Sequence, residues 1–93
     1  MSSPTSPAHR SPWRVSRAAP HPVVQNASPE PLVLARAMIR VGDRVDTEQW
    51  GTVLPGDENE ICLCGVDTSD ACVTVSWRRS GRTAEELLWQ FVM

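Results

Sequence analysis

The fold is decided by four short apolar runs between Met38 and Val92: Ile39–Val45 (IRVGDRV), Trp50–Leu54 (WGTVL), Ile61–Cys64 (ICLC) and Val73–Trp77 (VTVSW). Each run is rich in β-branched or aromatic residues, and Gly, Pro, Asp, Asn or Ser residues separate it from the next. Short apolar runs bounded by turn residues are typical of antiparallel strands. The sequence therefore predicts an all-β domain built from short antiparallel strands.

The connections between these runs predict where the strands end. The first strand is expected over Met38–Val45, with Gly42-Asp43 as a bend or bulge inside it. The acidic turn Pro55–Glu60 predicts a hairpin between a strand at Trp50–Leu54 and a strand at Ile61–Val66.

The clearest alternation in the chain lies between Cys72 and Trp77. Val73, Val75 and Trp77 recur at every second position, so these three side chains are expected to face the core. The intervening Cys, Thr and Ser residues are expected to face outward.

The last residues, 82–93, are ambiguous between helix and strand. Thr83 and Glu86 have capping-box spacing, which favours a helix, whereas a final strand through Trp89–Val92 would close a barrel. We favour a single helical turn after a tight turn at Ser80-Gly81, followed by a strand.

The first third of the chain has a different composition. Seven of the eight prolines lie within residues 1–31, together with six serines, and no apolar periodicity precedes Ala27. Such a segment cannot bury enough apolar surface to offset the entropy of ordering its backbone. We therefore expect a disordered Pro/Ser-rich tail over residues 1–34 and a folded domain over residues 35–93.

The expected domain is acidic. Residues 35–93 contain six Arg against ten Asp or Glu, a net charge of −4, and the chain has no Lys. An acidic domain repels phosphate, which disfavours nucleic acid as a partner unless the basic residues cluster on one face.

No feature of the sequence indicates a membrane. No run approaches the roughly 20 apolar residues of a membrane span, and the first residues lack a hydrophobic signal core. We therefore expect an intracellular protein, cytoplasmic or nuclear, with no membrane partner.

Three motifs carry a resemblance to a known fold. Val41–Val45 (VGDRV) is followed by Gly51–Val53 (GTV) and then by Val73–Trp77 with a Gly-containing turn. This succession resembles the SH3-like barrels of the Tudor, KOW and Mib/Herc2 kind, and it is similar to the SH3-like modules of large hybrid ubiquitin-conjugating enzymes. Those families often continue Trp-Asp-x-Gly, whereas this chain has Trp77–Gly81 (WRRSG).

The resemblance implies a small five-stranded, strongly bent antiparallel barrel over residues 35–93. A core this small leaves only about 3–5 kcal/mol of net stability. Its expected core residues are Val41, Val45, Val53, Leu63, Val73, Val75 and Leu88.

Two tryptophans and three arginines are the candidate binding residues. Trp50 and Trp77 could wall an aromatic cage for methylated Lys or Arg, but such cages need three or four aromatic rings, so we favour core packing. Arg78, Arg79 and Arg82 could hold phosphate or an acidic peptide, or they could form a solvated hairpin tip. The partner groove is expected to lie near these five residues.

The three cysteines do not indicate a metal site. Cys62 and Cys64 lie on one strand face, no Cys-x-x-Cys turn is present, and His9 and His21 lie in the expected tail. We expect these thiols and Cys72 to be structural, with no metal and no cofactor, while a disulfide between Cys64 and Cys72 stays open.

Catalytic motifs are also missing from the sequence. The expected domain has no His, and the chain has no Gly-x-Ser-x-Gly or phosphate-loop motif, so we expect no catalytic residues and no enzyme activity. The favoured function is a non-catalytic protein-interaction module that binds a protein or peptide partner. The alternative is a KOW- or Tudor-like nucleic-acid or chromatin accessory domain.

Overall fold

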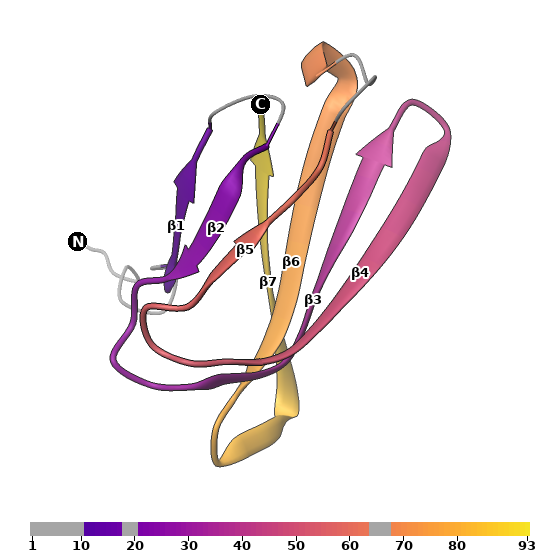
Figure 1. Cartoon of the computed structure of the whole chain (residues 1–93). Coiled ribbons are helices and arrows are strands. Elements are labelled where there is room, and N and C mark those ends of the chain that lie inside the picture. Colours follow the sequence, from indigo (N-terminus) through magenta and orange to yellow (C-terminus); the bar gives the residue numbers. More distant parts are fainter. Residues whose placement is uncertain (1–10, 18–20, 64–67) are drawn as a thin grey trace, which may run out of the picture.

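The chain folds mainly into β-strands (Figure 1). The computed structural model describes residues 11–17, 21–63 and 68–93, and the elements below belong to that part of the chain. They are β1 (Trp13–Ser16), β2 (Val23–Asn26), β3 (Leu32–Val41), β4 (Arg44–Val53), β5 (Glu58–Glu60), a 3₁₀ turn (Thr68–Asp70), β6 (Ala71–Arg79) and β7 (Arg82–Val92). The prediction of an all-β fold is confirmed.

The strands form two antiparallel sheets. One sheet has the order β1-β2-β5 and the other has the order β4-β3-β6-β7, and Figure 1 shows them as two layers. Two antiparallel layers that share an apolar interior make a β-sandwich. Among the described residues both sheets remain open, so the closed barrel that the resemblance implied is not found.

The turn after β4 explains why the predicted hairpin at Pro55–Glu60 does not form. The Asp57 N–H donates to the Leu54 carbonyl at 2.9 Å, and the Asn26 N–H donates to the Asp57 carbonyl at 3.0 Å. The Gly56 N–H in turn donates to the Asn26 carbonyl at 2.8 Å. These bonds hold the turn against the end of β2, so β5 pairs with β2 and not with β4.

The strand expected over Ile61–Val66 is not observed where the structure can be described. Ile61 and Leu63 are buried, but residues 61–63 belong to no strand. Residues 64–67, which include Cys64, lie outside the described part of the chain.

A long hairpin replaces the predicted bend at Gly42-Asp43. β3 ends at Val41 and β4 begins at Arg44, so these two residues form the turn. Gly42 has a φ of 58°, a left-handed conformation that two-residue hairpin turns require and that glycine adopts at no steric cost.

A β-bulge near Leu34 changes the side-chain alternation of β3. The pairing with β4 shifts register between Leu32 and Ala35, and Leu34 has a φ of 52°. The extra residue lets Leu32 and Ala35 both point into the interior, although strict alternation would place them on opposite faces.

β7 corrects the prediction for the C-terminal residues. The tight turn at Ser80-Gly81 is confirmed, but the chain is a strand from Arg82 onward, so the predicted helical turn is wrong. The capping-box spacing of Thr83 and Glu86 is a local preference. Antiparallel pairing with β6 overrides it, because the pairing satisfies backbone groups along the whole segment.

The core lies between the two sheets, and most of the expected residues belong to it. Its buried apolar residues are Trp13, Val24, Leu32, Ala35, Ala37, Ile39, Val53, Ile61, Leu63, Ala71, Val73, Val75, Trp77 and Phe91. Val41 is only half-buried. Val45 and Leu88 are 58% and 63% exposed, so their assignment to the core is wrong: each lies on the outer face of an edge strand.

The expected tail differs from the structure from Ser11 onward. Trp13 is 5% exposed and Val24 is fully buried, so β1 and β2 contribute directly to the core. Strands of four residues need only one or two inward side chains, which leaves no detectable apolar period in the sequence. Residues 1–10 lie outside the described part of the chain.

Candidate functional site

The two tryptophans predicted to be binding residues lie on either side of a third. The ring centroid of Trp13 is 5.9 Å from that of Trp50 and 5.7 Å from that of Trp77, and both pairs are edge-to-face. Such pairs stabilise a core beyond the area they bury. Trp77 is 5% exposed and Trp50 is half-buried. Trp13 therefore fills the space between the two rings that a ligand-binding cage would leave open.

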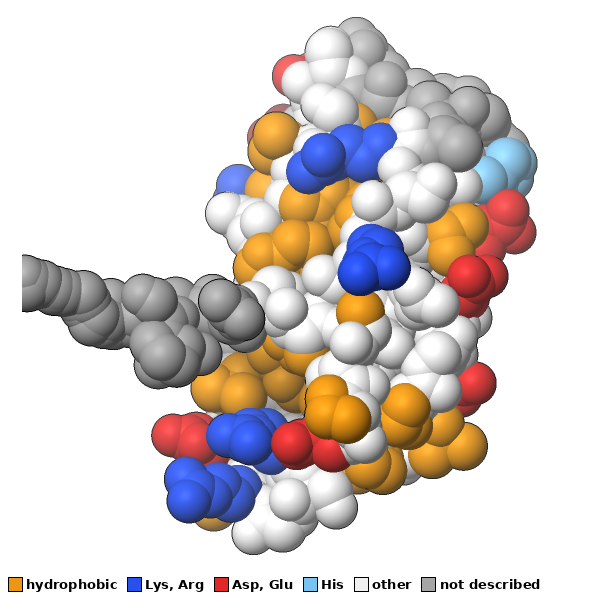
Figure 2. All heavy atoms as spheres, turned by 90° about the vertical axis from the view of Figure 1, so that its left-hand side faces the viewer, with side chains coloured by type: hydrophobic (Ala, Val, Ile, Leu, Met, Phe, Trp, Pro, Cys, Tyr) orange, Lys and Arg blue, Asp and Glu red, His pale blue; other side chains and the backbone are white. Residues whose placement is uncertain are grey.

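A groove with a volume of about 880 Å³ lies beside β7, and we call it the β7 groove. Three parts of the chain form it: Ser11-Pro12, the loop that follows β2 together with the first residue of β3, and the paired strands β6 and β7. Figure 2 looks at the β1 side of the molecule, where hydrophobic side chains show between charged ones. The apolar side chains that line the groove include Leu32, Trp77, Leu87, Leu88 and Trp89.

Charges of both signs border these apolar side chains. Arg79, Arg82, Glu30 and Glu85 line the groove. The guanidinium of Arg79 donates two hydrogen bonds of 3.4 Å to the two carboxylate oxygens of Glu30. Because both side chains are partly exposed, solvent screens this pair and it adds little to stability. Its bidentate geometry does fix the position of the Arg79 side chain within the groove.

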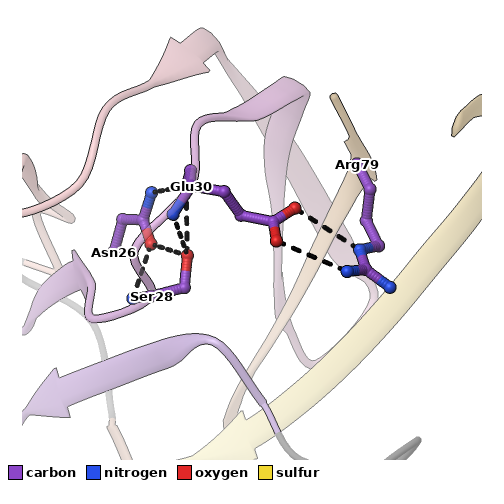
Figure 3. Close-up of polar contacts among 4 residues, drawn as sticks. All are labelled: Asn26, Ser28, Glu30 and Arg79. Carbon is purple, nitrogen blue, oxygen red and sulfur yellow. Dashed lines mark hydrogen bonds and ion pairs between the residues drawn. The ribbon is translucent and has the colours of Figure 1, made fainter. Parts of the chain in front are cut away.

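The loop that carries Glu30 is held by a network of hydrogen bonds (Figure 3). The Asn26 side-chain amide donates to the Glu30 carbonyl at 3.0 Å, and its oxygen accepts from the Ser28 N–H at 2.9 Å and the Ser28 hydroxyl at 2.7 Å. Asn26 is fully buried. This wall of the groove is thus ordered by a buried side chain, and a partner would meet a preformed surface.

The predicted arginine cluster is divided between the two faces of the larger sheet. Arg79 and Arg82 line the β7 groove, whereas Arg78 lines a smaller depression together with Arg36 and Glu86. Arg78 donates a hydrogen bond to the Thr83 carbonyl. Arg36 lies 3.3 Å from the Glu86 carboxylate. Neighbouring residues of a strand point to opposite faces, so a run of two arginines cannot form one patch.

Of the five predicted binding residues, the structure brings three together in the β7 groove: Trp77, Arg79 and Arg82. Arg78 lies on the other face, and Trp50 does not line the groove. Sequence reasoning missed Leu87 and Trp89. Their spacing with Phe91 is the period of two of a strand, and this signal could have found both residues.

The part of the chain that is described contains no group of three or more His, Cys, Asp or Glu side chains placed to hold a metal ion. Cys62 is exposed and Cys72 is half-buried, while Cys64 lies outside the described residues. Among the described residues, no helix has the length and apolar character that crossing a membrane requires.

Comparison of the chain with protein-family models, with curated proteins and with solved structures finds no match.

Proposed function

We propose that this protein is a non-catalytic protein-interaction module that binds a peptide or protein partner in the β7 groove. The observation that carries the proposal is an open groove whose apolar side chains, Leu87, Trp77 and Trp89, are bordered by both Arg and Glu side chains. Protein-binding sites combine apolar anchors with a polar rim in this way.

The β-sandwich architecture is compatible with this role but does not determine it. Immunoglobulin and fibronectin type III domains share this architecture without sequence similarity, and one fold serves many functions. The proposal therefore depends on the chemistry of the groove.

The nucleic-acid alternative has less support from the described residues. Three arginines lie within 4 Å of a carboxylate: Arg36 near Glu86 at 3.3 Å, Arg79 near Glu30 at 3.4 Å and Arg44 near Asp46 at 3.8 Å. A nucleic-acid site needs guanidinium groups that are free to neutralise phosphates. A partner in the β7 groove is better matched by a peptide with apolar side chains and charges of both signs.

A peptide selection followed by affinity measurements tests the proposal. Peptides selected from a random library against the full chain are titrated against the native protein, Trp89→Ala and Trp50→Ala. Both tryptophans are half-buried, but only Trp89 lines the groove. We expect Trp89→Ala to weaken binding at least about tenfold, while Trp50→Ala leaves it nearly unchanged.

Two results would contradict the proposal. One is that no selected peptide distinguishes Trp89→Ala from the native chain. The other is oligonucleotide binding that falls steeply with salt and is lost in a triple variant with Ala at Arg78, Arg79 and Arg82, which would favour the nucleic-acid alternative.

A further inference from the structure

β7 is an edge strand of unusual length for a domain of this size. It spans eleven residues, Arg82–Val92, and is the last strand in the order β4-β3-β6-β7. Among the described residues, β6 is the only strand that pairs with it. The backbone N–H and C=O groups on the other side of β7 are thus directed away from the sheet, and such groups can accept another strand.

The second half of β7 lacks the features that protect edge strands. Leu87–Val92 (LLWQFV) contains no charged residue, no Pro and no Gly. Natural proteins block free edges with charges, prolines, bulges or very short strands. The opposite edge of the same sheet has such protection: β4 carries Arg44, Asp46 and Glu48, and its pairing is irregular near Gly51.

Both faces of this half of β7 carry large apolar side chains. Leu88 and Val92 lie on the outer face and are each 63% exposed. On the inner face, Trp89 is half-buried and its ring centroid lies 5.3 Å from that of Phe91. On the outer face only the uncharged Gln90 separates Leu88 from Val92, and the described residues leave both apolar side chains largely uncovered.

We propose that β7 pairs with β7 of a second copy of this chain, antiparallel and about a twofold axis at Gln90. In this register Leu88 lies opposite Val92 of the second copy, and Val92 lies opposite Leu88. Trp89 likewise lies opposite Phe91 of the second copy on the inner face. The two most exposed large apolar side chains of β7 thus contact each other at two symmetry-related positions. The two four-stranded sheets become one sheet of eight strands.

The charges of the strand disfavour the registers whose axis lies nearer to Glu86. An axis at Trp89 would place Glu86 opposite Val92 of the second copy, and an axis at Leu88 would place Glu85 opposite Phe91. Each shift brings a carboxylate against an apolar side chain, which is unfavourable because the carboxylate loses water without gaining a partner. The axis at Gln90 pairs uncharged residues only.

A symmetric pairing also explains why the assembly would stop at two copies. Each chain has one β7, and the twofold contact occupies the same uncharged half of that strand in both copies, so the interface is closed. A fibre that extends this sheet head to tail would pair β7 with β4 of the next copy, and the charged side chains of β4 disfavour this contact. The pairing involves few residues, so we expect a reversible dimer that depends on concentration.

This inference does not rest on the proposed function, although Leu88 and Trp89 belong both to this interface and to the β7 groove, because self-association is measured on the purified chain without any other partner. Sedimentation equilibrium of the full chain is expected to show a mass that rises with concentration from 10.3 kDa towards twice that value. Hydrogen exchange of the Leu88–Val92 amides is expected to slow as the dimer forms.

Leu88→Lys is expected to raise the dimer dissociation constant at least about tenfold, because it places an uncompensated charge at two equivalent positions. Val45→Lys is the matched control. Val45 is similarly exposed and lies on the outer face of the opposite edge strand, so this variant is expected to dimerise like the native chain. Both residues are surface side chains, and circular dichroism is expected to show an unchanged fold.

A charge pair tests the register itself. Val92→Glu alone is expected to weaken the dimer, as Leu88→Lys does, whereas the double variant Leu88→Lys/Val92→Glu is expected to restore it, because each Lys then faces a Glu of the second copy. A chain that stays monomeric up to its solubility limit would overturn the proposal. Dimerisation lost in Val45→Lys but kept in Leu88→Lys would overturn it as well, and so would a double variant without restored affinity.

Discussion

Asn26 is a fully buried polar side chain at the end of β2, and all of its hydrogen-bonding groups are used. Its amide nitrogen donates to the Glu30 carbonyl and, at 2.9 Å, to the Val53 carbonyl, and its oxygen accepts two bonds from Ser28. Asn26 thus joins β2, the loop that forms one wall of the β7 groove, and the last residue of β4.

We expect Asn26→Ala to lower the free energy of unfolding by about 2–3 kcal/mol, because the buried Val53 carbonyl loses the Asn26 donor and the Glu30 carbonyl keeps only the Ser28 hydroxyl as a side-chain donor. Ser28→Ala is the control. It removes one hydroxyl but keeps the Ser28 N–H bond to Asn26, so its cost should be about 1 kcal/mol. Urea denaturation measures both values, and equal effects of the two variants would show that the Asn26 amide bonds do not stabilise the fold.

The strands show which elements could be predicted from the sequence. The alternation of Val73, Val75 and Trp77 placed β6 correctly, because a strand with one buried face has a period of two. Ser76 lies on the outer face, as expected, yet it is buried because Arg36 covers it and donates a hydrogen bond of 3.1 Å to its hydroxyl. Contacts of this kind join residues forty positions apart, and no local pattern contains them.

Substitutions at two neighbouring residues test which face of β6 is buried in the core. Val75→Asp is expected to unfold the domain, because Val75 is completely buried and an unpaired carboxylate there costs more than the roughly 3–5 kcal/mol that such a small core provides. Thr74→Asp, on the outer face, is expected to cost less than about 1 kcal/mol. Circular dichroism and thermal melting distinguish the two, and a folded Val75→Asp variant would show that β6 faces the other way.

At the scale of the whole molecule, the N-terminal third of the chain completes the core, although its sequence predicts a disordered tail. Residues 11–34 read as a tail because Pro and Ser dominate them and their apolar residues are isolated. In the structure the isolated apolar residue Trp13 lies between Trp50 and Trp77. The Arg17 guanidinium lies 5.9 Å from the centre of the Phe91 ring. The groove wall at Ser11-Pro12 and the loop after β2 could not be placed without these long-range contacts.

The last prediction tests whether β1 belongs to the fold. Trp13→Ala is expected to cost about 3–5 kcal/mol, since it leaves a large cavity between two other tryptophans, and this would unfold most of the protein. Trp13→Phe is expected to cost less than about 1.5 kcal/mol. It keeps an aromatic ring and removes a buried indole N–H that has no hydrogen-bond partner among the described residues. Arg14→Ala, at an exposed neighbour of Trp13 on β1, is the control and should change stability by less than about 0.5 kcal/mol.

If Trp13→Ala melted at the temperature of the native chain in a calorimetric scan, β1 would not contribute to the core, and the expectation of an unpacked N-terminal tail would hold instead.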